Sequence, residues 1–268
     1  MPLLTLTSDI GSPDYLVAAV KANLLKINEG FEIVDISHNI PPFNHPQAAY
    51  VCRSAIRHFP DYTYHLILVN LFEQRPIQLL LAFHNDQYLL CADNGLLTMI
   101  LEETPEMLIG IPLDQKQQMS TTYIASRMGE VVQQLVEGEP IRNIGNPEPQ
   151  FIEKRHLRPV LDKDSIEGQI IFIDSFENVI VNITRQQFEE QRQGRPFRIV
   201  FKRDEFITRI SDTYADVPQG DKLALFNSAG YLEIAINKGN AAGLFGLKGF
   251  SEKQQSQLSY QTVKIYFE

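Results

Sequence analysis

The arrangement of apolar segments changes near the middle of the chain, and this change constrains the fold most strongly. In the first half, short apolar runs alternate with amphipathic helical segments, which favours a layered α/β domain with a mostly parallel sheet. Beyond residue 166 the runs are short, β-branched and separated by turn residues, which favours a small β-barrel or a β-sandwich. We therefore predict an N-terminal α/β domain over 1–145, a linker over 146–163 and a C-terminal β domain over 164–268.

The periodicity also places individual elements. Buried strands are expected in the first half at 3–7, 31–36, 64–70, 77–83 and 87–92, with helices at 15–28, 46–58 and 128–136. In the second half, strands are expected at 166–174, 178–184, 197–202, 223–227, 231–236 and 262–267, with one short helix at 184–192.

Composition excludes several classes of function. The net charge is −9, and the 24 Lys and Arg residues are scattered, so we expect no nucleic-acid partner. The longest apolar runs, such as 77–83, are too short to span a bilayer, so no membrane partner is expected. The first residues do not have the pattern of a signal peptide. Two cysteines are too few for a disulfide framework, which fits a reducing, cytoplasmic location.

The turn after the first strand carries two carboxylates, Asp9 and Asp14. Ligands of α/β domains bind at the carboxyl ends of the strands, and phosphate sites there use glycines and a bare helix N-terminus. Carboxylates instead suit hydroxyl donors such as a ribose diol, or a cation. A purely structural interpretation stands beside this one, with Asp14 as a helix-start acid and Asp9 as a turn former.

Other polar residues also gather at turns, while the common catalytic motifs are absent from the sequence. His38 and His45 lie seven residues apart across a Pro-Pro loop, but no third ligand is near, so no metal site is expected. Each turn cluster alone has a local structural explanation. Together they would suit a polar, diol-bearing, partly cationic ligand. The clusters are Asp9/Asp14, Asn70/Arg75, 93–94, 174–178 with Asn182, and 226–230.

Five segments, in order along the chain, resemble the S-adenosyl-L-methionine (SAM) hydroxide adenosyltransferases, which are related to the SAM-dependent chlorinases and fluorinases. The segments are 5–11 (TLTSDIG), 34–43 (VDISHNIPPF), 92–98 (ADNGLLT), 173–178 (IDSFEN) with 181–183 (VNI), and 227–237 (NSAGYLEIAIN). The resemblance implies an α/β domain followed by a β-barrel domain. It also implies a homotrimer that holds SAM between the N-terminal domain of one subunit and the C-terminal domain of the next.

The resemblance further implies a reaction in which water attacks the ribose C5′ of SAM, releasing methionine and forming adenosine without a cofactor. By resemblance, Asp9 would accept hydrogen bonds from the ribose hydroxyls, and the ring of Phe43 would pack against the ribose and the sulfonium. Asp14 and Asp174 would contact the ammonium group of the methionine part of SAM. Ser228, in the same turn as Asn227, would bind the carboxylate of that methionine part. Phe176 and Tyr214 would flank the adenine ring. Asn178 and backbone groups near Ile236 and Lys238 would form hydrogen bonds with the edge of the adenine.

The chain departs from the family where the water is handled. The family reads Val-Asp-Pro-Gly-Val-Gly and then Arg, whereas residues 69–75 read VNLFEQR, so Asn70 replaces the Asp and Arg75 matches the Arg. A family His is replaced by Tyr123 in 120–126 (STTYIAS). An amide cannot accept a proton, and an ordinary Tyr is a poor base at neutral pH. Glu73 is open to two interpretations, as a substitute base or as a solvated loop acid.

Two functions follow from this pattern. The first is a SAM hydrolase whose water site uses Asn70, Arg75 and Tyr123. The alternative is a relative that binds SAM or adenosine as a sensor, because the ligand-holding positions are kept and the water-handling positions are not. Halide as the nucleophile is disfavoured, because the long inserted loop of the halogenases has no counterpart in this sequence.

Overall fold

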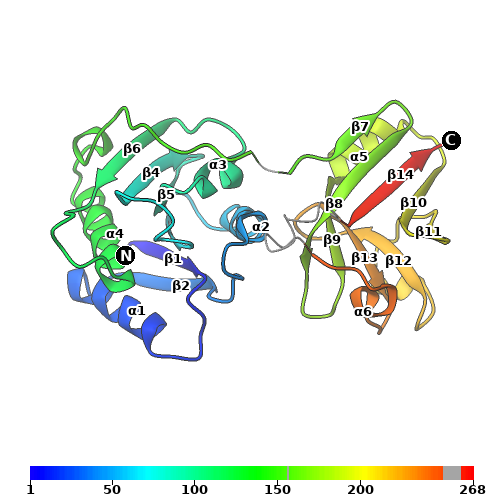
Figure 1. Ribbon diagram of the computed structural model, residues 1–268, viewed down its shortest axis with the longest axis horizontal. Helices are drawn as coiled ribbons and strands as arrows, with labels where there is room; N and C mark the ends of the chain where they lie inside the picture. The colour runs from blue at the N-terminus through cyan, green and yellow to red at the C-terminus, as the bar shows by residue number, and fades with distance from the viewer. Residues whose placement is uncertain (156, 250–260) are drawn as a thin grey trace. The chain divides into compact units, whose positions relative to one another are not determined.

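The computed structural model describes residues 1–155, 157–249 and 261–268. It divides into two compact units, Met1–His156 (unit 1) and Leu157–Glu268 (unit 2). Each unit has its own sheet and its own hydrophobic core, and the two are described separately (Figure 1).

Unit 1 is built on a six-stranded sheet with the order β2-β1-β3-β5-β4-β6. The pairs β1–β2, β1–β3 and β3–β5 are parallel, whereas β4 runs antiparallel to both of its neighbours. The sheet is therefore mostly parallel, as predicted, and β4 is the strand that runs in the opposite direction. The strands are β1 (Leu3–Ser8), β2 (Glu32–Ser37), β3 (Tyr64–Leu68), β4 (Gln78–His84), β5 (Gln87–Ala92) and β6 (Met107–Pro112).

Helices cover both faces of this sheet. On β3, Leu66 and Leu68 belong to the cluster that includes residues of α1 (Leu16–Ile27) and α4 (Thr121–Val136). Ile67, which points to the opposite face, belongs to the cluster with α2 (His45–Ile56) and α3 (Leu96–Leu101). A central strand buried on both faces explains why the sequence of β3, Tyr-His-Leu-Ile-Leu, does not alternate between buried and exposed residues.

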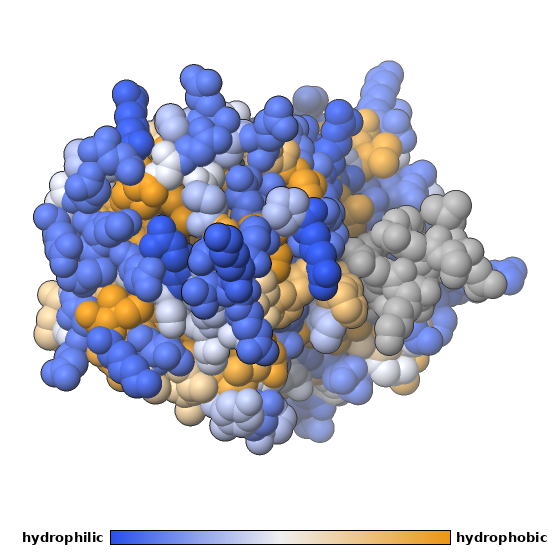
Figure 2. Space-filling model, turned by 60° about the vertical axis from the view of Figure 1, so that its left-hand side comes forward, coloured by the Kyte–Doolittle hydropathy of each residue, from blue (hydrophilic) through white to orange (hydrophobic). Residues whose placement is uncertain are grey.

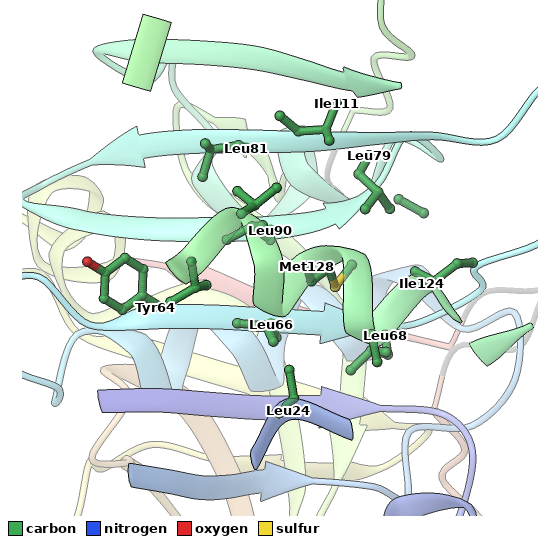
Figure 3. Packing of buried hydrophobic residues seen from close by; sticks show 14 of the residues in the cluster. Leu24, Tyr64, Leu66, Leu68, Leu79, Leu81, Leu90, Ile111, Ile124 and Met128 are labelled. Atoms are coloured by element: carbon green, nitrogen blue, oxygen red, sulfur yellow. The ribbon is translucent and has the colours of Figure 1, made fainter. Parts of the chain in front are cut away.

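The core under α1 and α4 is closely packed (Figure 3). Leu24 and Met128 are fully buried in it, one from each helix. Gly129 permits this close approach, because a Cβ there would lie 2.7 Å from the side chains of Leu24 and Ile27. The carboxyl ends of β1 and β3 are thus fixed by a rigid three-layer framework.

Unit 2 is an antiparallel, nearly closed barrel-like sheet. Its described strands run in the order β11-β10-β14-β8-β9-β13-β12, with β7 paired to β8. Phe188 of α5 is fully buried at its centre, against Phe197, Phe226 and Phe267. The elements are β7 (Val160–Asp162), β8 (Ser165–Ile173), β9 (Val179–Thr184), α5 (Arg185–Arg192), β10 (Phe197–Lys202), β11 (Glu205–Ile207), η2 (Tyr214–Asp216), β12 (Lys222–Phe226), β13 (Tyr231–Ile236), α6 (Ala241–Phe245) and β14 (Thr262–Phe267).

Most expected elements are present with ends shifted by one or two residues, and the exceptions are instructive. Helix α4 begins at Thr121 and not near Met128, because Ser120 caps it by accepting a hydrogen bond from the Tyr123 amide. Strands β6, β7 and β11 and helices α3 and α6 were not predicted. Helix α3 has six residues, too few to show a clear periodicity.

Much of the stretch expected to be a linker makes specific contacts within the two units. Asn146 pairs with Gly110 of unit 1, and a short 3₁₀ helix, η1 (Ile141–Asn143), precedes it. The Ile152 amide donates to Asp93 Oδ1 at 2.8 Å. On the other side, β7 joins the sheet of unit 2. Prolines in this stretch gave it a linker-like sequence, but the backbone hydrogen bonds of the stretch are made within the units.

The face drawn in Figure 2 is mostly hydrophilic, with small apolar areas between charged side chains. Within the described ranges, no helix combines the length and the apolar character needed to cross a bilayer.

Candidate functional site

Asp9 lies directly after β1, at the carboxyl edge of the sheet, as predicted. Its Oδ2 accepts a hydrogen bond of 2.8 Å from the backbone amide of Asn70, which follows β3. Partial burial raises the pKa of the Asp9 carboxyl above its usual value, although the Asn70 hydrogen bond acts in the opposite direction. Asp9 is thus a tertiary link between two strand ends, and more than a local turn former.

Asn70 leads from Asp9 to an ionic network. Its φ of 49° lies in the left-handed region, which Asn tolerates better than most residues. Its side-chain Nδ2 donates to Glu73. The Glu73 carboxylate is also 2.8 Å from Lys154 Nζ and 3.3 Å from His45 Nε2. We call these five residues, Asp9, His45, Asn70, Glu73 and Lys154, the unit 1 half-site.

The two histidines considered as a metal pair have different partners. His38 Nδ1 is 2.7 Å from Ser8 Oγ, and its Nε2 is 3.1 Å from Asp35 Oδ1, so His38 joins the ends of β1 and β2. His45 instead faces Glu73. Among residues 1–155, 157–249 and 261–268, no group of three or more His, Cys, Asp or Glu side chains could hold a metal ion.

Two further predicted ligand residues of unit 1 lie in exposed loops. Asp14 Oδ1 accepts a hydrogen bond of 2.8 Å from the Leu16 amide, which agrees with the helix-start interpretation. Phe43 exposes 57% of its surface and has a φ of 63°. A bulky side chain with positive φ is a backbone outlier of the kind that is enriched at ligand sites.

The predicted water-handling residues are not brought into one hydrogen-bonded group. Arg75 is exposed in the loop between β3 and β4, before a cis proline. Tyr123 lies in the first turn of α4, and its hydroxyl accepts a hydrogen bond of 3.3 Å from the Asp114 amide. Of the three residues predicted to handle water, only Asn70 is bonded to Asp9 in the part of the chain that the structure describes.

In unit 2, the loop between β8 and β9 is organised by Asp174. Its Oδ1 accepts hydrogen bonds from the backbone amides of Phe176 (2.9 Å) and Asn178 (2.8 Å). Its Oδ2 accepts from Asn178 Nδ2 at 3.1 Å. Phe176 is 76% exposed, so the loop presents an aromatic ring at its tip. The Ala242 amide of α6 bonds the Glu177 carbonyl and ties the loop down.

A buried carboxylate lies next to this loop. The Tyr214 hydroxyl donates to Glu233 Oε1 at 2.6 Å, and Glu233 is 3% exposed on β13. Burial raises the pKa of Glu233, and the nearby charge of Asp174 adds to this increase. Burial and the bond to Glu233 also raise the pKa of Tyr214. With Asn227, these residues form the unit 2 half-site: Asp174, Asn178, Tyr214, Asn227 and Glu233.

The turn between β12 and β13 completes the set of predicted residues. Asn227 Oδ1 accepts hydrogen bonds from the amides of Ala229 (3.0 Å) and Tyr231 (3.1 Å). Its side chain also lowers the pKa of Glu233 through a hydrogen bond, against the larger effect of burial. Ser228 is exposed at the tip of this turn. The two predicted turn clusters of unit 2 are therefore joined through Glu233.

Sequence reasoning gave no site role to Lys154 or Glu233 and considered His45 only as a metal ligand. Lys154 lies within the expected linker, where a lysine carries no signal. Glu233 offered a signal that could have found it, because a charged residue interrupts the apolar run from Tyr231 to Ile236. A charge within a strand that is buried along its whole length is paired or functional more often than not.

Comparison with family models agrees with both halves of the chain. The model of the SAM hydroxide adenosyltransferase N-terminal domain matches residues 4–145. The model of the C-terminal domain of the same family matches residues 168–253.

Individual relatives extend over nearly the whole length of the chain. An (R)-S-adenosyl-L-methionine hydrolase of Methanocaldococcus jannaschii is 27% identical, covering 94% of this chain and 95% of that protein. A fluorinase of Actinopolyspora mzabensis is 23% identical over 92% of this chain and 94% of its own. The crystal structure of an uncharacterized conserved protein from Thermotoga maritima is 26% identical and has a TM-score of 0.82, covering 98% of this chain and 99% of its own.

Proposed function

The chain belongs to the SAM hydroxide adenosyltransferase family, and we propose that it hydrolyses SAM to adenosine and L-methionine. Similar proteins from Methanocaldococcus jannaschii and Thermus thermophilus, each 27% identical, are named (R)-S-adenosyl-L-methionine hydrolases. Water attacks the ribose C5′, the C5′–S bond breaks, and its electron pair stays on the sulfur of methionine. One proton is released per turnover.

The acidic character of both half-sites is the observation that carries this proposal. SAM combines a sulfonium cation and an ammonium group with a ribose diol, and carboxylates attract the first two and accept hydrogen bonds from the third. Unit 1 supplies Asp9, which is partly buried, and unit 2 supplies Asp174 and Glu233. A phosphate-bearing ligand would be repelled by the same groups.

Exposed aromatic rings support the ligand assignment. We propose that Phe43 covers the ribose and sulfonium, while Phe176 and Tyr214 flank the adenine and Asn178 bonds its edge. Each of these three rings is more than 40% exposed. Because large exposed aromatic side chains are common where a ligand will stack, their exposure fits a site that is completed by SAM.

We further propose that SAM is held at a subunit interface of a homotrimer, with no bound cofactor. The proposed ligand residues are divided between the two units, so a shared ligand requires a residue set from each. Analytical ultracentrifugation would test the assembly. A monomer that binds SAM at full affinity would contradict the interface.

The reaction is tested by prolonged incubation of the purified protein with SAM, with chromatographic detection of adenosine and methionine. Asp9→Ala serves as the variant that removes the proposed diol acceptor, and parallel reactions contain or lack chloride. Adenosine that forms in the wild-type protein, independently of chloride, and disappears in Asp9→Ala supports the hydrolase. A 5′-chloro product would instead identify halide as the nucleophile.

A second candidate function is binding of SAM or adenosine without turnover. It is favoured by one observation, the engagement of the Tyr123 hydroxyl by the Asp114 amide at a position where the family motif has a histidine. Tight binding of SAM by calorimetry with no adenosine formed would establish this function in place of the hydrolase.

A further inference from the structure

The loop after β3 carries a carboxylate that the proposed ligand contacts do not use. Glu73 receives a hydrogen bond from Asn70 Nδ2. Its Oε1 is 2.8 Å from Lys154 Nζ, and its Oε2 is 3.3 Å from His45 Nε2. Three polar groups from three separate segments of the chain thus converge on one side chain, which remains 29% exposed.

The partners of Glu73 are fixed by the fold. Lys154 donates its backbone N–H to Thr98 Oγ1 at 3.0 Å, and the Thr98 hydroxyl donates back to the Lys154 carbonyl at 2.9 Å. The Lys154 alkyl chain passes over Gly95, where a Cβ would lie only 2.4 Å from its Cγ. His45 is 3% exposed at the first residue of α2. A solvated loop acid would not have partners held in this way.

Asn70 connects this carboxylate to the proposed ribose site. Its backbone N–H bonds Asp9, and its side-chain NH₂ bonds Glu73. One residue therefore relates the position of Asp9 to that of Glu73.

We propose that Glu73 accepts the proton of the attacking water, an assignment that rests on the proposed function. The water oxygen forms a bond to C5′ as the C5′–S bond breaks and leaves its electron pair on sulfur. The water proton passes to the Glu73 carboxylate, and the oxygen becomes the 5′-hydroxyl of adenosine. The proton then leaves the Glu73 carboxyl, which is 29% exposed, for solvent.

The alternatives within the site are chemically weaker. The Asn70 amide has no basic lone pair at neutral pH. The Tyr123 hydroxyl already accepts a hydrogen bond from the backbone amide of Asp114. The charged and titratable groups near Glu73 are His45 from α2, Lys154 from the segment after residue 150, and Asp9 after β1, with Arg75 further along the same loop. The Lys154 ammonium lies 2.8 Å from Glu73 Oε1 and holds the carboxylate in place beside Asn70.

The test is the single-turnover rate of adenosine formation as a function of pH. Glu73→Gln keeps the shape of the side chain and removes its basicity. We therefore expect the rate of adenosine formation to fall by at least about 10²-fold, while the SAM affinity stays within about threefold of wild type. The fall of the wild-type rate at acid pH disappears in this variant. Glu130→Gln, which removes an exposed carboxylate of α4, is the matched control and keeps the wild-type rate.

Chemical rescue separates a proton acceptor from a structural role. Glu73→Ala leaves space for formate, and added formate restores a measurable part of the rate if the carboxylate accepts the proton. A Glu73→Gln protein with the wild-type rate and pH profile overturns the assignment, as does a Glu73→Ala protein that loses SAM affinity and is not rescued. If the wild-type protein forms no adenosine, the proposed hydrolase fails first, and this assignment fails with it.

Discussion

In the unit 1 half-site, contacts join residues that are far apart in sequence, whereas in the unit 2 half-site most of them are local. Asp9 and Asn70 are 61 positions apart, Glu73 and Lys154 are 81, and His45 and Lys154 are 109. In unit 2, Asp174 bonds a residue four positions away. The exception is the bond between Tyr214 and Glu233, 19 positions apart.

This difference reflects how each sheet is built. Parallel strands need long crossover connections, so residues that meet at the carboxyl edge of the unit 1 sheet come from distant parts of the sequence. Antiparallel strands are joined by tight turns, so polar residues of one turn meet one another. The unit 1 half-site is therefore expected to respond to changes anywhere in its network, and the unit 2 half-site to changes within a single turn.

The largest expected effect follows from changing the tertiary link at Asp9. Asp9→Asn keeps an oxygen that can accept the hydrogen bond from the Asn70 amide. It removes the negative carboxylate that would accept hydrogen bonds from the two ribose hydroxyls. Because hydrogen bonds to charged groups are strong, we expect SAM affinity to fall by about 10²-fold in calorimetry. Unchanged affinity would show that Asp9 only fixes the strand ends.

The same variant carries a stability prediction of the opposite sign. Since the pKa of Asp9 is raised in the folded protein, its ionisation costs folding stability, and this cost grows as pH rises through the folded pKa. We expect the thermal midpoint of Asp9→Asn to equal or exceed that of wild type at pH 7, with a smaller difference near pH 4. A clear loss of stability at pH 7 would contradict this.

The next largest effect tests the local turn of unit 2. Asp174→Ala removes the acceptor of three hydrogen bonds, two of them from backbone amides, and we expect a loss of about 1–2 kcal/mol in the free energy of unfolding. Asp174→Asn keeps one acceptor oxygen and should lose less. Asp204→Ala, at an exposed turn, is the control in urea denaturation.

A smaller effect concerns the bond between Tyr214 and Glu233, the long-range contact of the unit 2 half-site. Burial raises the pKa of Glu233, so the stability that its protonated form provides is lost as pH rises through the folded pKa. Glu233→Gln removes this dependence and keeps a partner for the Tyr214 hydroxyl. We expect the variant to gain stability relative to wild type, by about 1 kcal/mol or less, as pH rises above the usual pKa of a glutamate side chain. Parallel stability curves for the two proteins would contradict the assignment.

The smallest effect is expected at Lys154. Its ion pair with Glu73 is about one-third exposed, so solvent screens it, and Lys154→Met should cost only about 0.2–1 kcal/mol of stability. Methionine keeps the contact over Gly95. Hydrogen exchange of the Asn70 amide should nevertheless accelerate, because Glu73 loses one of its anchors. Exchange that is unchanged would show that the network does not depend on Lys154.

The sequence by itself determined the α/β unit, the β unit and most strand positions, because apolar period and turn residues are local properties. It also singled out Asp9, Asn70, Asp174, Asn178 and Asn227 as candidate site residues, since polar residues at strand ends and turns stand out from apolar runs. Family resemblance added their proposed roles, which the half-sites are consistent with.

Only the tertiary structure decided which of these residues meet. Lys154 lies in a stretch that resembles a linker, and nothing local places it beside Glu73. Likewise, no local pattern indicates that Tyr123 is engaged by Asp114 or that Glu233 lies beneath Tyr214. In unit 1 the order of the parallel strands and the packing of helices on both sheet faces set these contacts, and in unit 2 the register of the antiparallel strands sets them. Those interactions are spread over each whole unit and are not encoded in any one segment.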